Sequence, residues 1–358
     1  MNSKTQIAFS SKNHEGLERF LSSQKQPYST AMIISDHQVF SLFGESLMQT
    51  LEKTGVNLSE PFLFSAGEPY KTLATVENAW THMHAHGLDR KSLVIAFGGG
   101  VVTDLAGFAA ACYMRGIAHI CLPTTLMGMV DAAIGGKTAV NIPTGKNLVG
   151  AFHHPVLIDI AIPYLDQLPN REFHSGLAEV IKYGVIADAK LYHYLESHME
   201  AIVRRDPTVL DKIIRTSCAI KTDIVDKDEK EAGIRAYLNF GHTFAHAIEA
   251  ITHYTTYLHG EAVSIGMCCA AQLSAELGLV DHHFVQKLTE LCRKAELPTQ
   301  LPHSINLDTF ISLMEGDKKS ISKKITLIVV EKIGKVERLP NIDPLLIKKA
   351  LCKMQNHQ

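Results

Sequence analysis

The chain has 358 residues, of which 46% are hydrophobic and 20% are charged, and its formal net charge is -2 at pH 7. This composition is typical of globular proteins and excludes disordered, collagen-like and low-complexity chains. The balanced charge also argues against a nucleic-acid partner, because nucleic-acid binders usually carry a basic domain or stripe.

The first half of the chain alternates short apolar runs with a helical pattern. The runs at residues 30–35, 61–65, 92–97 and 118–122 predict strands, and residues 73–86 predict a helix. Continuous apolar strands separated by helices are typical of a parallel sheet that is covered on both faces. This half therefore predicts an α/β, Rossmann-like domain with a parallel sheet.

Helical patterns dominate the second half of the chain. They cover residues 172–185, 189–204, 208–226, 241–251 and 259–277, whereas the clearest strand pattern lies at 324–330. The change in pattern falls near residues 165–172. We therefore predict two domains, an α/β domain at residues 1–168 and a mainly α-helical domain at residues 169–358.

The cysteine pattern and the apolar segments indicate the cellular compartment of the protein and whether it crosses a membrane. The seven cysteines form no C-x-x-C pair and their number is odd, which favours free thiols in a reducing compartment. The N-terminus shows no signal-peptide pattern. The apolar residues 262–280 include Ser264, Gln272, Ser274 and Glu276, which favours a buried amphipathic helix over a membrane span. We expect a cytoplasmic protein without a membrane partner.

A glycine turn is the first candidate binding feature. Gly98, Gly99 and Gly100 follow the strand at 92–97, and Asp104 lies in the first turn of the helix expected next. Glycines let the backbone approach a phosphate, and a helix N-terminus offers free N–H donors. Because the G-x-G-x-x-G fingerprint is absent, these residues alone leave a plain tight turn equally open.

A second candidate is the stretch at residues 123–147, which is dense in polar side chains among glycines. Two G-K steps, at Lys137 and Lys146, resemble a phosphate-cradling loop, although the P-loop spacing is missing. A polar loop of this length predicts a functional role rather than mere connection.

A third candidate is a metal site built from histidines and carboxylates. His242 and His246 share one helical face, Glu249 lies one turn further, and His259 begins the next predicted helix. Glu179 lies on an earlier helix. Catalytic zinc sites commonly take three such ligands, but the spacing leaves open which of these side chains converge.

Eight sequence blocks carry a resemblance to a known family. They are GGGVVTDLAGFAAACYMRG, VDAAIGGKTAVN, GKNLVGAF, LPNRE, GLAEVIKYG, LNFGHTFAHAIE, HGEAV and DKK, and the resemblance as a whole extends from about residue 67 to residue 334. In this order they resemble the 3-dehydroquinate synthase family of sugar phosphate cyclases, whose fold is similar to that of glycerol dehydrogenases. The chain departs from the family pattern at VDAAIGGK, at HTFAH and at Gln167, where the family has a threonine that contacts NAD.

The resemblance implies two cofactors, with NAD in the first domain and zinc, or alternatively cobalt, in the second. The implied metal ligands are Glu179, His242 and His259. The implied NAD contacts are Glu68, Lys71, Gly99, Gly100, Asp104, Thr124, Thr125, Lys137 and Lys146.

The resemblance also implies a set of substrate-site residues, most of them in the second domain, which is expected to bind metal and substrate. The implied residues are Arg115, Asp131, Lys137, Asn147, Lys182, Lys221, Arg235, Asn239, His246 and the pair Lys318 and Lys319. In the family the counterpart of Arg115 reaches the site of the neighbouring subunit, which implies a homodimer.

The implied reaction is a phosphate-eliminating cyclisation in the shikimate pathway of aromatic amino-acid biosynthesis. It converts 3-deoxy-D-arabino-heptulosonate 7-phosphate into 3-dehydroquinate and phosphate. Its steps are transient oxidation by NAD, elimination, re-reduction and an intramolecular aldol closure. Fixed cations would hold the phosphate and carboxylate of the substrate, and zinc would stabilise the alkoxide that gives up hydride.

Three other functions remain to be weighed. Cyclases that act on sedoheptulose 7-phosphate or glucose 6-phosphate have substrates without a carboxylate, and Lys221, Arg235 and Asn239 favour the carboxylated substrate. A polyol dehydrogenase would turn over NAD, and the VDAAIGGKTAVN and DKK blocks argue against it. A non-catalytic binding protein would not need so complete a set of ligands and cations.

Overall fold

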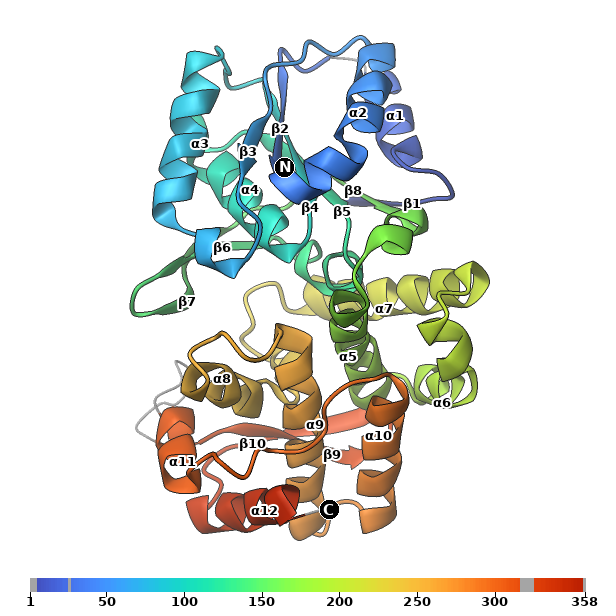
Figure 1. Ribbon diagram of the computed structural model, residues 1–358, viewed down its shortest axis with the longest axis vertical. Coiled ribbons are helices and arrows are strands. Elements are labelled where there is room, and N and C mark those ends of the chain that lie inside the picture. The colour runs from blue at the N-terminus through green and yellow to red at the C-terminus, as the bar shows by residue number, and fades with distance from the viewer. Residues whose placement is uncertain (1–4, 25–26, 316–324, 357–358) are drawn as a thin grey trace. The chain divides into compact units, whose positions relative to one another are not determined.

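The computed structural model describes residues 5–24, 27–315 and 325–356, and the chain divides into two compact units, one ending at Leu168 and one beginning at Pro169 (Figure 1). The first unit contains a six-stranded sheet in the order β1-β8-β5-β4-β2-β3, and all of its paired strands are parallel. The strands are β1 (Gln6–Ser10), β2 (Ala31–Asp36), β3 (Phe62–Phe64), β4 (Leu93–Gly98), β5 (Ala118–Pro123) and β8 (Leu157–Ala161).

Helices cover both faces of this sheet (Figure 1). They are α1 (Glu15–Ser22), α2 (His37–Thr54), α3 (Leu73–Ala85) and α4 (Gly100–Cys112). Helix α1 packs against α2, and α3 packs against α4. Because β2 and β4 are buried along their whole length, their sequences are continuous apolar runs. The prediction of a parallel α/β sheet is confirmed.

The polar stretch predicted as a loop contains regular structure. A π-helical turn, η3 (Gly128–Ala132), precedes an antiparallel hairpin of β6 (Lys137–Ile142) and β7 (Gly145–Phe152). Strand β6 packs against α4, and its Thr138 and Val140 are buried. This alternation is that of a half-buried strand, but the lysines and glycines around it hide the pattern in the sequence.

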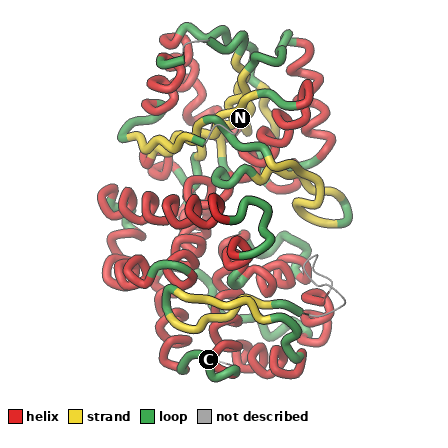
Figure 2. Tube along the Cα trace, turned by 180° about the vertical axis from the view of Figure 1, so that it is seen from behind, coloured by secondary structure: helices red, strands yellow, loops and turns green. Residues whose placement is uncertain are grey.

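The second unit is mainly helical, as predicted, and its strands form one antiparallel pair (Figure 2). Its strands are β9 (Leu327–Lys332) and β10 (Lys335–Leu339). Its helices are α5 (Asn170–Ile186), α6 (Ala189–Val203), α7 (Pro207–Lys227), α8 (His242–Ile251), α9 (His259–Glu276), α10 (His282–Lys294), α11 (Leu307–Glu315) and α12 (Pro344–Asn356).

Helix α9 forms the core of the second unit. It packs against α5, α8, α10, α12 and β9, so it is buried on nearly every side rather than amphipathic as predicted. Its polar residues are accommodated inside, since the Ser274 hydroxyl donates to the Ala270 carbonyl at 2.7 Å and accepts from the Val330 N–H at 2.9 Å. In the described part of the chain, no helix combines the length and apolar character needed to cross a membrane.

Candidate active site

The glycine turn lies at the carboxyl end of β4, beside the same end of β5. The Thr124 N–H donates to the Gly98 carbonyl at 3.0 Å. A Cβ atom on Gly99 would lie only 2.9 Å from Cγ2 of Thr125. Close approach to the β5 turn therefore requires glycine here, and it leaves the N-terminus of α4 accessible to an anionic group.

The strand order places this turn where nucleotides bind in related architectures. Strand β3 lies on one side of β2, whereas β4, β5 and β8 follow on its other side. In open α/β sheets, ligands bind at the carboxyl ends of the strands, next to such a change of direction. The first unit thus offers a candidate NAD site at the ends of β4 and β5.

A polar network near this turn joins the segment at residues 68–71, helix α4 and both strands of the β6–β7 hairpin. Lys71 is buried, forms an ion pair with Asp104 on α4, and donates to Oδ1 of Asn147 at 2.7 Å. The Asn141 amide donates to Oε1 of Glu68 at 2.8 Å and accepts the Asn147 N–H at 3.0 Å. The network brings together four of the predicted residues. Asn141 was not among the predicted site residues, although it lies within the block VDAAIGGKTAVN.

The remaining predicted residues of the first unit are more dispersed. Lys137 and Lys146 lie on the β6–β7 hairpin, and Asp131 lies in η3. Arg115 ends η2 (Tyr113–Arg115), in a left-handed conformation with φ 71°. This turn follows α4, whose 13 residues place it about 20 Å from the glycine turn. Arg115 is therefore separated from the glycine turn.

In the second unit, Glu179, His242 and His259 converge. One potential ligand atom from each lies within 4.8 Å of the others. Oε1 of Glu179 is 3.5 Å from Nε2 of His242 and 4.0 Å from Nε2 of His259. Glu179 is fully buried and ion-paired with Lys182, yet neither of its oxygens accepts a hydrogen bond from a described residue. A buried carboxylate facing two imidazoles fits a divalent cation such as zinc.

The protonation of His242 also suits a metal ligand. Burial, followed by the charges of Lys182 and the neighbouring histidines, holds the pKa of His242 well below its usual range. Its Nδ1 lies 3.2 Å from the Phe240 carbonyl oxygen, which indicates that Nδ1 carries the proton. Nε2 then presents a lone pair toward Glu179.

Helix packing fixes the separation of these ligands. A Cβ atom on Gly260, next to His259, would overlap the carbonyl of Ser175 on α5. A Cβ atom on Gly266 would overlap the carbonyl of Gly241, which directly precedes α8. The three helices that carry the ligands therefore meet through backbone contacts.

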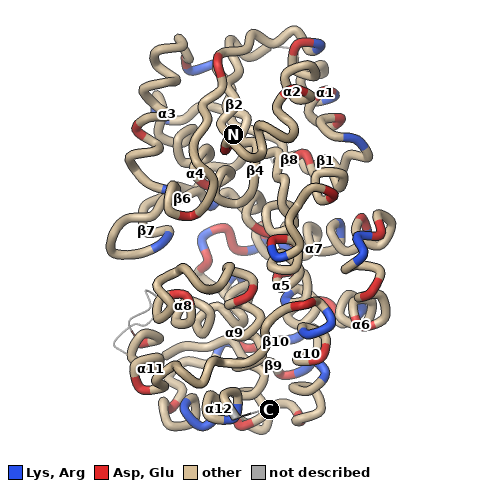
Figure 3. The backbone as a smooth tube through the Cα atoms, viewed as in Figure 1, with Lys and Arg blue, Asp and Glu red and all other residues tan. Residues whose placement is uncertain are grey.

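Buried cations accompany the metal cluster. Lys182, Lys221 and Arg235 are 1%, 6% and 2% exposed, and they come from α5, α7 and η5 (Ile234–Asn239), which pack against one another. Elsewhere in both units, Lys and Arg are interspersed with Asp and Glu (Figure 3). A local group of buried cations is suited to an anionic ligand, as predicted for a nearly neutral chain.

The other predicted substrate residues have different surroundings. The Asn239 amide donates to Oε1 of Glu231 at 2.5 Å. The ring of His246 lies 5.9 Å from that of His242, measured between centroids. Lys318 and Lys319 lie outside the described residues.

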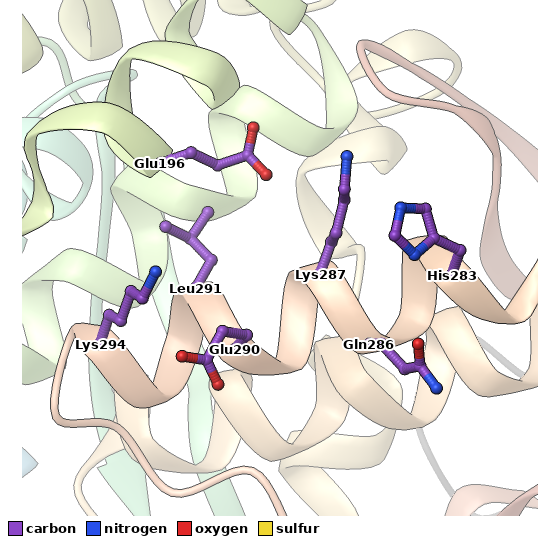
Figure 4. A pocket seen from close by; sticks show the side chains of 7 residues that line it. All are labelled: Glu196, His283, Gln286, Lys287, Glu290, Leu291 and Lys294. Carbon is purple, nitrogen blue, oxygen red and sulfur yellow. The ribbon is translucent and has the colours of Figure 1, made fainter.

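A surface hollow between α6 and α10 contains none of these candidates (Figure 4). It is lined by Glu196, His283, Gln286, Lys287, Glu290, Leu291 and Lys294. Figure 4 shows Glu196 projecting from α6 toward the basic side chains of α10. Its mixed charge and lack of converging ligands favour the metal cluster as the reactive site.

Comparison with known proteins identifies the family. The model of the 3-dehydroquinate synthase N-terminal domain matches residues 61–175, and that of the C-terminal domain matches residues 176–320. The chain belongs to the 3-dehydroquinate synthase family. It is 45% identical to the 3-dehydroquinate synthase of Thermodesulfovibrio yellowstonii, over 85% of each chain. It is 43% identical to that of Microcystis aeruginosa, over 91% of this chain and 89% of the relative.

The structure of this 3-dehydroquinate synthase family member is similar to solved structures of other cyclases and of a dehydrogenase. ValA, a 2-epi-5-epi-valiolone synthase from Streptomyces hygroscopicus with NAD+ and Zn2+ bound, has a TM-score of 0.89 and 28% identity, covering 99% of this chain and 97% of ValA. A 2-deoxy-scyllo-inosose synthase, complexed with carbaglucose-6-phosphate, NAD+ and Co2+, has a TM-score of 0.86 and 26% identity, covering 97% and 96%. A probable glycerol dehydrogenase from Sinorhizobium meliloti shares the fold at 14% identity, with a TM-score of 0.69 and coverage of 98% and 96%. The family and fold expected from the sequence blocks are confirmed.

Proposed function

We propose that the chain is a 3-dehydroquinate synthase, which converts 3-deoxy-D-arabino-heptulosonate 7-phosphate into 3-dehydroquinate and phosphate. The observation that carries this proposal is the match of both family models, without a gap, across residues 61–320. Identity to curated 3-dehydroquinate synthases reaches 45%, compared with 28% for the valiolone synthase. The difference favours the carboxylated substrate over those of the sister cyclases.

The proposed cofactors are NAD in the first unit and zinc, or cobalt in its place, in the second. NAD would supply the acceptor and donor of hydride, and the metal would supply a Lewis acid that lowers the pKa of a substrate hydroxyl. Glu179, His242 and His259 would hold the metal. Gly99, Gly100 and the N-terminus of α4 would receive the NAD phosphates. Glu68, Lys71, Asp104, Thr124, Thr125, Lys137 and Lys146 would complete the NAD site.

The proposed substrate site uses the buried cations for binding and orientation. Lys182, Lys221 and Arg235 would neutralise the phosphate and carboxylate of the substrate and restrict its conformations before the aldol step. His246 lies one helical turn from His242, so it would hold or move a proton beside the leaving phosphate. Asp131, Lys137, Asn147, Asn239 and Lys318 complete the proposed set.

We also propose a homodimer and a cytoplasmic location. The position of Arg115 beyond the far end of α4, away from the glycine turn, supports its use in a partner subunit. None of the seven cysteines forms a disulfide bond, which supports a reducing compartment. Sedimentation of the purified protein tests the dimer, and a monomer at the concentrations used in the assay would contradict it.

A substrate comparison tests the proposed activity. Protein supplied with NAD and Zn2+ is incubated with 3-deoxy-D-arabino-heptulosonate 7-phosphate, with sedoheptulose 7-phosphate or with glycerol, while phosphate and NADH are measured. We expect phosphate release from the first compound alone, without accumulation of NADH. Phosphate release from sedoheptulose 7-phosphate instead would indicate a sister cyclase. Steady NADH formation from glycerol would indicate a dehydrogenase.

A further inference from the structure

Glu249 lies behind the proposed metal cluster, on the same helix as His242. The two residues are seven positions apart on α8, which corresponds to two helical turns and therefore to the same face. Glu249 is only 3% exposed. Its backbone carbonyl accepts the Tyr254 N–H at 2.8 Å, which holds the start of the turn that leads to α9.

The carboxylate of Glu249 faces the ring nitrogen of His259 that points away from Glu179. Oε1 of Glu249 lies 3.3 Å from Nδ1 of His259, whereas Nε2 of His259 lies 4.0 Å from Oε1 of Glu179. A carboxylate can only accept in this contact, so Nδ1 carries the proton and donates it. Nε2 is then left with its lone pair directed toward the cluster.

The Nδ1 atoms of the two histidines in the cluster face different hydrogen-bond acceptors. Nδ1 of His242 faces the neutral Phe240 carbonyl at 3.2 Å, whereas Nδ1 of His259 faces a buried carboxylate. His259 needs such support more, because its side chain is 38% exposed and begins a helix, whereas that of His242 is 12% exposed. A charged acceptor both orients the ring and increases the electron density at the other nitrogen.

We infer that Glu249 is a positioning residue that acts through His259, fixing its ring and tautomer for metal binding without itself ligating the metal. This inference rests on the metal site of the proposed function. It also gives a role to Glu249, which helical spacing alone left open as a ligand and which the resemblance does not include among the ligands.

The experiment measures zinc affinity rather than turnover. The full-length metal-free protein is titrated with Zn2+ in competition with a chromophoric chelator, and the Co2+ form is examined by its visible spectrum. Glu249→Gln keeps an acceptor but loses the charge, and Glu249→Leu loses both. We expect zinc affinity to fall about 10-fold in the Gln variant and about 100-fold in the Leu variant, with a changed Co2+ spectrum in the latter.

A double-mutant cycle distinguishes a positioning role of Glu249 from direct ligation of the metal. In a His259→Ala background, Glu249→Leu should change zinc affinity less than about 2-fold, because the residue through which it acts is missing. A further loss of affinity in that background as large as the loss in the single Glu249→Leu variant would overturn the inference and identify Glu249 as a ligand itself. Unchanged zinc affinity in both single variants would also overturn it.

A matched control addresses loss of stability. Glu276→Gln removes another buried carboxylate, near the other end of α9, about 25 Å from His259 along the helix axis. We expect this variant to bind zinc as the parent does, and a loss of zinc affinity like that of Glu249→Gln would overturn the inference.

If the parent protein itself binds no zinc or cobalt, the proposed metal site fails, and with it the inference. If the parent binds zinc but releases no phosphate from the expected substrate, only the proposed activity fails.

Discussion

Nζ of Lys71 lies 2.7 Å from Oδ1 of Asn147, and this hydrogen bond joins the turn before α3 to the β6–β7 hairpin. Because Lys71 also pairs with Asp104 on α4, one buried ammonium group connects three segments around the proposed NAD site. The arrangement connects the hairpin to the proposed cofactor site although it lies outside the main sheet.

Replacing this ammonium group should weaken NAD binding. In Lys71→Met, Asp104 and Asn147 lose a charged donor, so we expect the Kd for NAD to rise about 10-fold to 100-fold. Calorimetry with NAD measures the change. Lys53→Met, which removes an exposed lysine of the same unit, is the control and should leave the Kd unchanged. Equal NAD affinity in Lys71→Met and the parent would exclude Lys71 from the cofactor site.

The close contact between Gly99 and Thr125 predicts a reciprocal pair of substitutions. Gly99→Ala places Cβ 2.9 Å from Cγ2 of Thr125, so the glycine turn must shift and NAD affinity should fall about 10-fold. Thr125→Ser removes that methyl group but keeps the hydroxyl that accepts the Gly128 N–H. The double variant should therefore recover most of the affinity, as measured by NAD titration. Failure of the second substitution to restore binding would argue against a steric cause.

Removal of a metal ligand should abolish metal binding selectively. For His242→Ala we expect zinc affinity to fall by more than about 100-fold, beyond the range for residues that only support a ligand. Metal content per chain after dialysis, measured by mass spectrometry, is the readout. His193→Ala, which removes an exposed histidine of the same unit, should retain the metal of the parent. Retention of metal in His242→Ala would place the ion elsewhere.

Lys221 should distinguish the proposed substrate from its uncarboxylated analogue. If its buried ammonium group binds the carboxylate, Lys221→Ala should lower kcat/KM for 3-deoxy-D-arabino-heptulosonate 7-phosphate by about 10-fold to 100-fold. Residual turnover of sedoheptulose 7-phosphate should be little changed. Kinetics with both compounds provide the comparison, and equal losses would assign Lys221 to the phosphate or to the fold.

An ion-pair network in the second unit predicts a pH-dependent stability. Lys349 and Lys353 on α12 bond to the buried carboxylate of Glu276 and lower its pKa from 4.5 to about 2. Because the pKa is lower in the folded state, this stabilisation is complete above the unfolded value and is lost as the pH falls toward the folded value. Glu276→Gln should reduce the free energy of unfolding by about 2 kcal/mol near neutral pH.

Denaturant unfolding of the parent and of Glu276→Gln over a pH range measures this effect. The difference between them should be constant above about pH 5 and should shrink between about pH 4.5 and the lowest pH at which both fold. Asp211→Asn, which breaks an exposed pair with Arg215, should cost less than about 1 kcal/mol. A difference that did not change with pH would mean that Glu276 is not ionised in its network.

The sequence predicted strands best where both faces of the sheet are covered. Strands β2 and β4 are such cases, and their apolar runs were recognised. Strand β1 was missed because it lies at the edge of the sheet and is mostly not buried. Strand β8 was missed because Asp159 interrupts its apolar run. That carboxylate is inside because it accepts bonds from the Ser10 hydroxyl at 2.5 Å and the Leu17 N–H at 2.9 Å.

The candidate site was predictable only in part, because the local sequence pattern does not show which helices pack together. Helical spacing placed His242, His246 and Glu249 on one face of α8, but it contains no information about which helices that face meets. Convergence with Glu179 depends on the packing of α5 and α9, which spacing along a single helix does not encode. The family blocks supplied the missing choice between Glu249 and His259.

The backbone contacts at Gly260 and Gly266 have a consequence for how this centre tolerates change. Where Gly260 and Gly266 of α9 meet the carbonyls of Ser175 and Gly241, no Cβ atom separates the main chains, so the backbone itself sets the spacing at these two points. One added methyl group at either glycine would push the helices apart and disrupt the proposed metal site. The three ligands Glu179, His242 and His259 would nevertheless all be unchanged in the sequence.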